Sequence, residues 1–185
     1  VRARDVADFE KMYRIINNDP QNEILWVPAA AVKKIQKARY AEMVLHEMWC
    51  VANLRIKSVE IQGDSAAVRF HHPESRIQFE HPWPRPMVTK DGHNSAFYLT
   101  NAMELLDEPG EWYHDIESRK IYYYPRKGEK ISKAVVPGIE TLVWVEGTID
   151  RPVKHIRFDN IAFQYTTWMR PSLQGHVPLQ AGMYM

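Results

Sequence analysis

An aromatic stretch between Glu111 and Tyr124 constrains the fold of this chain more than any other part of the sequence. Glu111–Asp115 and Lys120–Tyr124 are rich in aromatic and β-branched residues, and a polar connection at 116–119 separates them. This pattern is typical of two antiparallel strands joined by a tight turn. The sequence therefore predicts a β-hairpin around which a β-rich domain is organised.

The residues before the hairpin carry signals for a short helical turn and a sharp reversal. Asn101 is a good N-cap type, and Glu104 follows it at the capping-box distance. Pro109–Gly110 then stops a helix, because proline lacks an N–H and glycine accepts a left-handed turn. We expect a helical turn over 102–106, followed by the reversal.

Hydrophobic alternation with a period of two begins at Ala41. It predicts antiparallel strands over 43–49, 54–61 and 66–70, with a turn at Gly63–Asp64. A further short strand is expected at Ile77–Phe79. These strands form an antiparallel meander.

The first forty residues have a helical period instead. Apolar residues at three- and four-residue spacings predict a helix over 5–16, and Pro28 at a first-turn position opens a second one to about Arg39. We interpret both as helices that pack on the sheet; binding to a partner is the alternative.

The hairpin also carries a family resemblance. GEWYHD, a short turn and then KIYYYP resemble a signature of large secreted proteins with a right-handed parallel β-helix (pectin-lyase-like) fold, many of them glycoside hydrolases of gut Bacteroidetes. The pieces NAMELLDEPGEWYHD, RPVKHIRFDNIAFQYTTW and GHVPLQAG follow in the order of that family. The similarity extends roughly from Ala41 to the end of the chain.

The residues after the hairpin fit the coil that this resemblance implies. Strands are expected at 134–137 and 141–146, and Lys154–Tyr165 has two short apolar alternations separated by Asp159–Asn160. Two strands with a bend at an asparagine are what one coil of a parallel β-helix needs. Because the chain starts without methionine and stops in mid-pattern, we expect a piece of a longer protein, truncated where the coils begin.

The expected fold class is mainly β with minor α. We predict a helical N-terminal segment at 1–40, an antiparallel β-rich domain at 41–137 that contains the hairpin 111–124, and the start of a right-handed parallel β-helix at 138–185. The remainder of the β-helix would be a partner of this chain.

Composition excludes several function classes. The net charge of +1 provides no electrostatic field that would attract nucleic acid. The sequence has no apolar run of ~18 residues, so we expect no membrane span. The histidines lack metal-ligand spacing, so we expect no metal, and without a phosphate or dinucleotide fingerprint we expect no cofactor. On the predicted strand, His46 lies too far from Cys50 to activate it, so Cys50 is interpreted as a buried structural thiol.

The resemblance implies a secreted or periplasmic polysaccharide-processing protein whose ligand is a carbohydrate. A glycosidase needs two convergent carboxyls, and no acidic pair in this sequence has a spacing that forces convergence. In the resembled enzymes the catalytic acids lie on later coils. The catalytic residues are therefore unknown, and we expect the fragment to be inactive alone.

Four residues are candidates for substrate contact. Trp168, Arg170 and His176 lie in a predicted loop that leaves a coil, and Trp83 lies among prolines. Trp168 and Trp83 offer faces for a sugar ring, Arg170 offers donors and His176 a titratable group. The alternative is structural: Trp168 caps the coil interior, His176 bonds within its loop, and Trp83 holds its own loop to the domain.

Two further function classes stay open beside the enzyme fragment. One is a non-catalytic carbohydrate-binding module, which requires an exposed platform of coplanar aromatic rings. It fails if the candidate aromatic residues are all buried, namely Trp83, Trp112, Tyr122 and Trp168. The other is a segment that only caps the solenoid.

Overall fold

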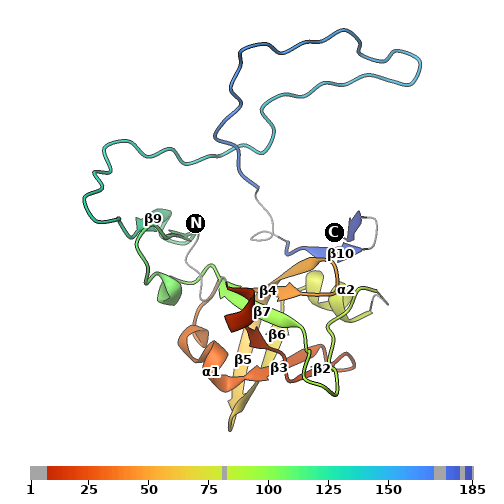
Figure 1. The fold of residues 1–185 in the computed structure, drawn as a ribbon, viewed down its shortest axis with the longest axis vertical. Coiled ribbons are helices and arrows are strands. Elements are labelled where there is room, and N and C mark those ends of the chain that lie inside the picture. The colour runs from red at the N-terminus through yellow and green to blue at the C-terminus, as the bar shows by residue number, and fades with distance from the viewer. Residues whose placement is uncertain (1–7, 81–82, 169–173, 180–181, 185) are drawn as a thin grey trace. The chain divides into compact units, whose positions relative to one another are not determined.

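The computed structural model of the chain describes residues 8–80, 83–168, 174–179 and 182–184 (Figure 1). They divide into two compact units, one made of Val1–Lys130 and Arg170–Met185 and the other of Ile131–Met169. We describe each unit by itself. The domain boundaries expected from the sequence stay predictions.

The first unit is built on one seven-stranded sheet in which every neighbouring pair is antiparallel. Its strands lie in the order β1 (Tyr13–Arg14), β7 (Ala96–Thr100), β4 (Glu42–His46), β5 (Val51–Gln62), β6 (Ser65–Phe70), β3 (Ile24–Pro28) and β2 (Asn17–Asp19). The mainly β class and the meander β4–β5–β6 are thereby confirmed.

The two edges of this sheet are formed by one short stretch of chain. β1 pairs with β7 at one edge, and β2 pairs with β3 at the other. Between them, the Ile15 amide donates to the Ser95 carbonyl (3.0 Å) and the Ile16 amide donates to the Trp26 carbonyl (2.6 Å). Residues 13–19 therefore join both edges and give the sheet a barrel-like closure, which leaves few backbone groups without a strand partner.

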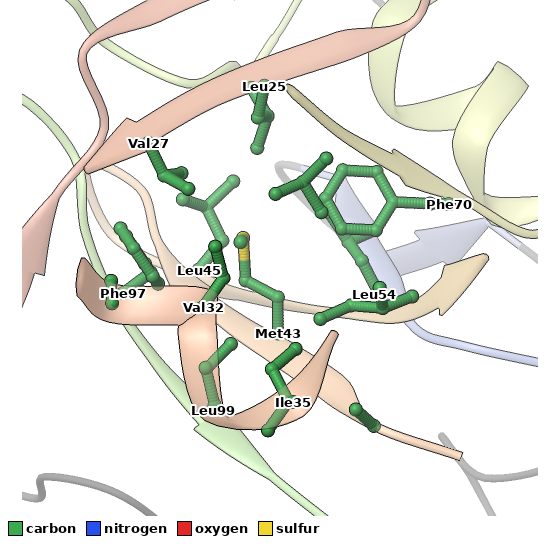
Figure 2. Close-up of a cluster of buried hydrophobic side chains, with 14 of the residues drawn as sticks. Leu25, Val27, Val32, Ile35, Met43, Leu45, Leu54, Phe70, Phe97 and Leu99 are labelled. Atoms are coloured by element: carbon green, nitrogen blue, oxygen red, sulfur yellow. The ribbon is translucent and has the colours of Figure 1, made fainter. Parts of the chain in front are cut away.

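The core lies inside this curved sheet (Figure 2). Leu25 and Val27 of β3, Met43 and Leu45 of β4, and Phe97 of β7 are at most 1% exposed. Val32 and Ile35, from α1 (Ala29–Val32) and η2 (Lys33–Ile35), complete the cluster. The helix expected over 28–39 is thus formed only in its first half, after Pro28 ends β3.

Two local predictions are wrong. The helix expected over 5–16 is replaced, in its described part, by the single 3-10 turn η1 (Phe9–Lys11) and by β1, because residues 13–16 bond to strand neighbours. The strand expected at Ile77–Phe79 is part of helix α2 (Glu74–Glu80), where the Ser75 amide donates to the His71 carbonyl at 2.9 Å.

The hairpin is confirmed as β8 (Trp112–Asp115) and β9 (Lys120–Tyr123). The turn before it is the 3-10 helix η3 (Met103–Leu105), whose N-cap is Ala102 without a side-chain bond. The capping box expected at Asn101 is therefore not formed. Gly110, with φ +97°, makes the predicted reversal.

The chain returns to the sheet near its end. The amide of His176 donates to the Asn53 carbonyl and the amide of Asn53 donates to the His176 carbonyl, both at 2.8 Å. Strand β10 (Val177–Leu179) then pairs with β11 (Gly182–Tyr184) in antiparallel fashion. The described strands of 138–185 are thus an antiparallel pair.

The second unit is drawn without helix or strand over residues 131–168 (Figure 1). Its large apolar side chains are all exposed, Trp144 and Ile149 most of all. Asn160 has φ +54°, at the position where the sequence predicts a bend. The strands at 134–137 and 141–146 and the coil at 154–165 are not formed here, and the parallel coil stays a prediction.

Within the described part of the chain, no helix is long and apolar enough to cross a bilayer.

Candidate ligand-binding groove

Two cavities in the first unit meet between the hairpin and the residues that lead into β4. One, of about 240 Å³, is lined by Tyr40, Tyr113 and Tyr122 together with charged side chains. The other, of about 330 Å³, shares Arg39, Tyr40 and Glu117 with the first. We call the two cavities together the tyrosine groove. Small-ligand sites are about 300–1,000 Å³, so the second cavity lies at the lower end of that range and the first just below it.

The hairpin supplies one wall of the groove. Tyr113 of β8 lies directly opposite Tyr122 of β9 in the strand register, so their side chains share one face. Tyr113 is half-buried against the hydrophobic core, whereas Tyr122 is 36% exposed. One ring is therefore fixed by packing, and the other presents its face to a ligand.

The hairpin turn is held rigid by Asp115. Its carboxylate accepts hydrogen bonds from the amides of Glu117 (3.1 Å) and Ser118 (3.2 Å) and from the Ser118 hydroxyl (2.6 Å). An ion pair with Arg119 or Lys120, its neighbours across the turn, would be the simplest partner for this carboxylate. Instead the carboxylate caps the turn, and Arg119 adopts φ +54°. This capping fixes the position of Glu117 at the groove.

The opposite wall comes from the segment before β4. Arg39 forms an ion pair with Glu117, and the Tyr40 hydroxyl donates to Glu117 Oε1 at 3.3 Å. The Tyr40 carbonyl accepts a bond from Asn101 Nδ2 at 3.0 Å. Asn101 therefore does not cap η3 but holds the backbone of Tyr40 in place at the groove.

A buried ionic network forms the floor. Glu74 is 1% exposed, and its Oε1 and Oε2 accept bonds from Arg55 Nε (2.6 Å) and Nη2 (2.9 Å). Glu42, also 1% exposed, accepts from Asn101 Nδ2 at 3.4 Å and lies opposite Arg55 in the strand register. A bidentate guanidinium–carboxylate pair is rigid, so the floor is preorganised before any ligand arrives.

The surroundings shift the pKa of two phenols and one carboxyl of the groove. Desolvation, followed by the Glu117 carboxylate, raises the pKa of the Tyr40 phenol, and burial together with Asp115 raises the pKa of Tyr113. The bonds from Ser118 lower the pKa of Asp115. At neutral pH these phenols are hydroxyl donors and Asp115 is an anion.

The charges lining the groove nearly balance. Its cations are Lys37, Arg39 and Arg55, and its carboxylates are Glu42, Glu104, Asp115 and Glu117. Such a surface has no excess positive charge to attract phosphate or carboxylate groups. It offers aromatic faces and hydrogen-bonding groups of both kinds, which suit a hydroxyl-rich neutral ligand.

Trp83, one of the predicted contact residues, lies outside this groove. Its ring is 39% exposed and lies 5.0 Å from the ring of Trp49, at an interplanar angle of 58°. The pairing with Trp49 was not predicted, because the two residues are far apart in sequence. The two rings are not coplanar and do not make a flat platform.

The other three predicted contact residues are distributed over the two units and a stretch outside the described residues. Trp168 is 49% exposed in the second unit, and His176 is half-buried in the bridge to β5. Arg170 lies outside the described residues. Their role in substrate contact stays a prediction. Trp83, Tyr122 and Trp168 are exposed, so the condition that would exclude a carbohydrate-binding module is not met.

Sequence reasoning did not find the groove. Its residues come from five separate parts of the sequence: 37–42, Arg55, His71, 101–104 and 113–122. One signal was available, since a hairpin with its turn at 116–119 places Tyr113 opposite Tyr122. Among the described residues, no group of three His, Cys, Asp or Glu side chains is arranged to hold a metal ion.

Comparison with known proteins gives two matches. A family model described as "GH141 insertion domain" matches residues 1–126. A solved structure titled "Glycoside hydrolase" is 71% identical, with a TM-score of 0.94, and the match covers 100% of this chain. The chain spans about a third (32%) of the length of that protein. No curated protein matches the chain.

Proposed function

Because this chain belongs to the family described as the GH141 insertion domain, we propose that it is a non-catalytic module of a polysaccharide-processing glycoside hydrolase. The match to a glycoside hydrolase over the whole chain carries this proposal. The substrate class is a polysaccharide or oligosaccharide, and the module helps to position it while hydrolysis takes place elsewhere in the parent protein.

Three of the four carboxylates that line the groove support a non-catalytic role. Glu117 pairs with Arg39, Asp115 caps the hairpin turn, and Glu42 accepts a bond from Asn101. A glycosidase requires one carboxyl that stays protonated and a second that faces it across the bond to be cleaved. These three carboxylates are engaged in holding the groove together, which suits binding better than proton transfer.

We further propose that residues 131–169 supply the first strands of a right-handed parallel β-helix in the parent. The support is their exposure: Ile156, Phe158, Ile161 and Phe163 are each at least 50% exposed, although they alternate with polar or small residues. An alternating apolar face is normally covered by a neighbouring coil. The remainder of the parent would provide that coil.

The competing function is a purely structural cap of the solenoid. The tyrosine groove favours a binding module over a cap, because a capping surface needs no preorganised polar floor. Secretion or export to the periplasm belongs to the same proposal, since polysaccharide substrates lie outside the cytoplasm. Detection of the parent in culture medium or periplasmic extract tests this location.

Hydrolysis is tested with the parent protein and the 185-residue chain side by side. Both are incubated with a panel of neutral and acidic polysaccharides, and released reducing ends are measured. We expect the parent to cleave at least one polysaccharide and the chain to cleave none. Cleavage by the chain alone overturns the non-catalytic role, and an intact, folded parent that cleaves nothing contradicts the hydrolase assignment.

A further inference from the structure

We infer that the tyrosine groove is a binding subsite for an uncharged sugar unit of the polysaccharide that the parent processes. This inference rests on the proposed function for the ligand class, and the groove itself identifies the site. It concerns residues other than Trp83, Trp168, Arg170 and His176, the contact candidates from the sequence.

Tyr122 provides the face on which the sugar stacks. Its ring is 36% exposed on the wall of the 240 Å³ cavity, opposite the fixed ring of Tyr113. A sugar ring has an apolar face of C–H groups, which an exposed aromatic ring removes from water. Because Tyr113 is held against the core, this wall is already ordered, and binding of the sugar does not have to offset an entropy loss for ordering it.

The polar groups around Tyr122 suit hydroxyls rather than charges. The Tyr40 hydroxyl, the Glu117 carboxylate and the Arg39 guanidinium already form one contiguous cluster. Together they offer both donors and acceptors, and a sugar hydroxyl needs both. The Arg39 charge is compensated by Glu117. Lys37 is a further cation of the lining, but an acidic sugar would meet four lining carboxylates against three cations.

The neighbouring cavity extends the site beyond one unit. It continues past Arg39 and Tyr40 to Asn101 and Arg55, over the rigid Arg55–Glu74 pair. The groove therefore extends from the hairpin, past the shared residues Arg39 and Tyr40, to the floor. This geometry fits a chain of linked sugars better than a single free monosaccharide.

The test measures binding by calorimetry with the parent protein and the 185-residue chain. The probes are cellohexaose, xylohexaose and mannohexaose as neutral oligosaccharides and hexagalacturonate as an acidic one. We expect saturable binding of a neutral probe, and Tyr122→Ala to weaken it roughly tenfold through the loss of the stacking face. Tyr122→Phe keeps the ring and should retain most of the affinity.

The matched control is Tyr124→Ala. Tyr124 is an equally exposed tyrosine just after β9, at 42%, and does not line the groove. The variant Tyr124→Ala should bind the neutral oligosaccharides with the affinity of the unchanged protein. Circular dichroism establishes that each variant is folded, and if Tyr122→Ala does not fold, Tyr122→Leu replaces it with the same expected loss of affinity.

The outcomes separate this inference from the proposed function. If the parent cleaves a polysaccharide but binds its oligosaccharides equally well with and without Tyr122, the groove is not the subsite. If hexagalacturonate binds most tightly and Tyr122→Ala weakens it, the uncharged class is wrong. If the intact parent neither binds nor cleaves any probe, both the inference and the proposed function fail.

Discussion

The reactivity of Cys50 follows from the residues around it. Burial, followed by the neighbouring Glu47 carboxylate, raises the pKa of this thiol from its ordinary value of 9.0 to about 12. At pH 8 the reactive thiolate is then roughly a thousandfold scarcer than for an ordinary thiol. We expect alkylation by iodoacetamide to be about a hundredfold or more slower in the folded 185-residue chain than in the same chain unfolded in guanidinium.

The variant Glu47→Gln distinguishes two causes of slow alkylation at Cys50: the nearby negative charge and the limited access of the reagent to the thiol. Cys50 Sγ donates to Glu47 Oε2 at 3.4 Å, so removal of the negative charge lowers the pKa of the thiol and speeds alkylation. The buried Gln78 amide, which donates to Glu47 Oε1 at 2.7 Å, can still bond to the glutamine oxygen. An unchanged or slower rate in this variant would show that access, not the carboxylate, controls Cys50.

Single residues were also where the sequence was least informative. Asn101 has the residue type of an N-cap, yet it adopts φ +60° and its side chain bonds to the Tyr40 carbonyl, 61 positions away in the sequence. Likewise, the Glu111 carboxylate accepts hydrogen bonds from the amides of Asp107 and Glu108, although the acidic side chains beside Pro109 are themselves typical turn acceptors. A local pattern cannot identify a partner that tertiary folding brings close.

At the scale of elements, the return of the chain to the sheet depends on one glycine. Gly175 has φ +69°, and a Cβ there would lie 2.8 Å from Cβ and 2.7 Å from Cγ of Glu74. Glu74 cannot move aside, because Arg55 holds its carboxylate beneath the groove. We expect Gly175→Ala to lower the free energy of unfolding by about 2–4 kcal/mol in urea titrations of the 185-residue chain.

Gly63→Ala is the control for backbone strain. Gly63 has a similar φ of +62°, but nothing lies within 4 Å of the position that an alanine methyl would occupy there. Only the left-handed backbone is penalised at this site, at about 1–2 kcal/mol. Equal losses in the two variants would mean that Glu74 yields and that contact with β10 does not depend on the glycine.

Elements with a strong local pattern were predictable. The aromatic hairpin and the meander β4–β5–β6 form where alternation indicated them, because each has its partner strand close in sequence. Ile77–Phe79 was mistaken for a strand because three residues of alternation cannot be distinguished from one turn of helix. The helix over 5–16 is replaced because β1 pairs with β7, which lies far along the chain, and because the Ile16 amide bonds to the Trp26 carbonyl of the nearby strand β3.

At the scale of the whole molecule, the sequence indicated a mainly β protein and a relation to glycoside hydrolases, and both are confirmed. The barrel-like closure by residues 13–19 was not predicted. It depends on the pairing of β1 with β7, two strands that lie some eighty residues apart in the sequence. The parallel coil remains a prediction for a physical reason. A coil needs a neighbour on which to stack, and residues 131–168 have no strand partner among the described residues.

If residues 154–165 form that coil in the parent, substitutions at neighbouring positions should differ sharply in their effect on the stability of the parent. Ile156 and Phe158 would face the interior of the β-helix in the parent, and Arg157, which pairs with Asp159, would face outward. In the parent we expect Ile156→Ser and Phe158→Ser each to lower the free energy of unfolding by about 2–5 kcal/mol and to lower the melting temperature. Arg157→Ser should change the melting temperature little.

The 185-residue chain is the control. There the side chains of Ile156 and Phe158 are about half exposed, so all three variants should unfold like the unchanged chain. Equal tolerance of the three substitutions in the parent would contradict the coil, because an interior β-helix position cannot accept a polar side chain as readily as its outward neighbour.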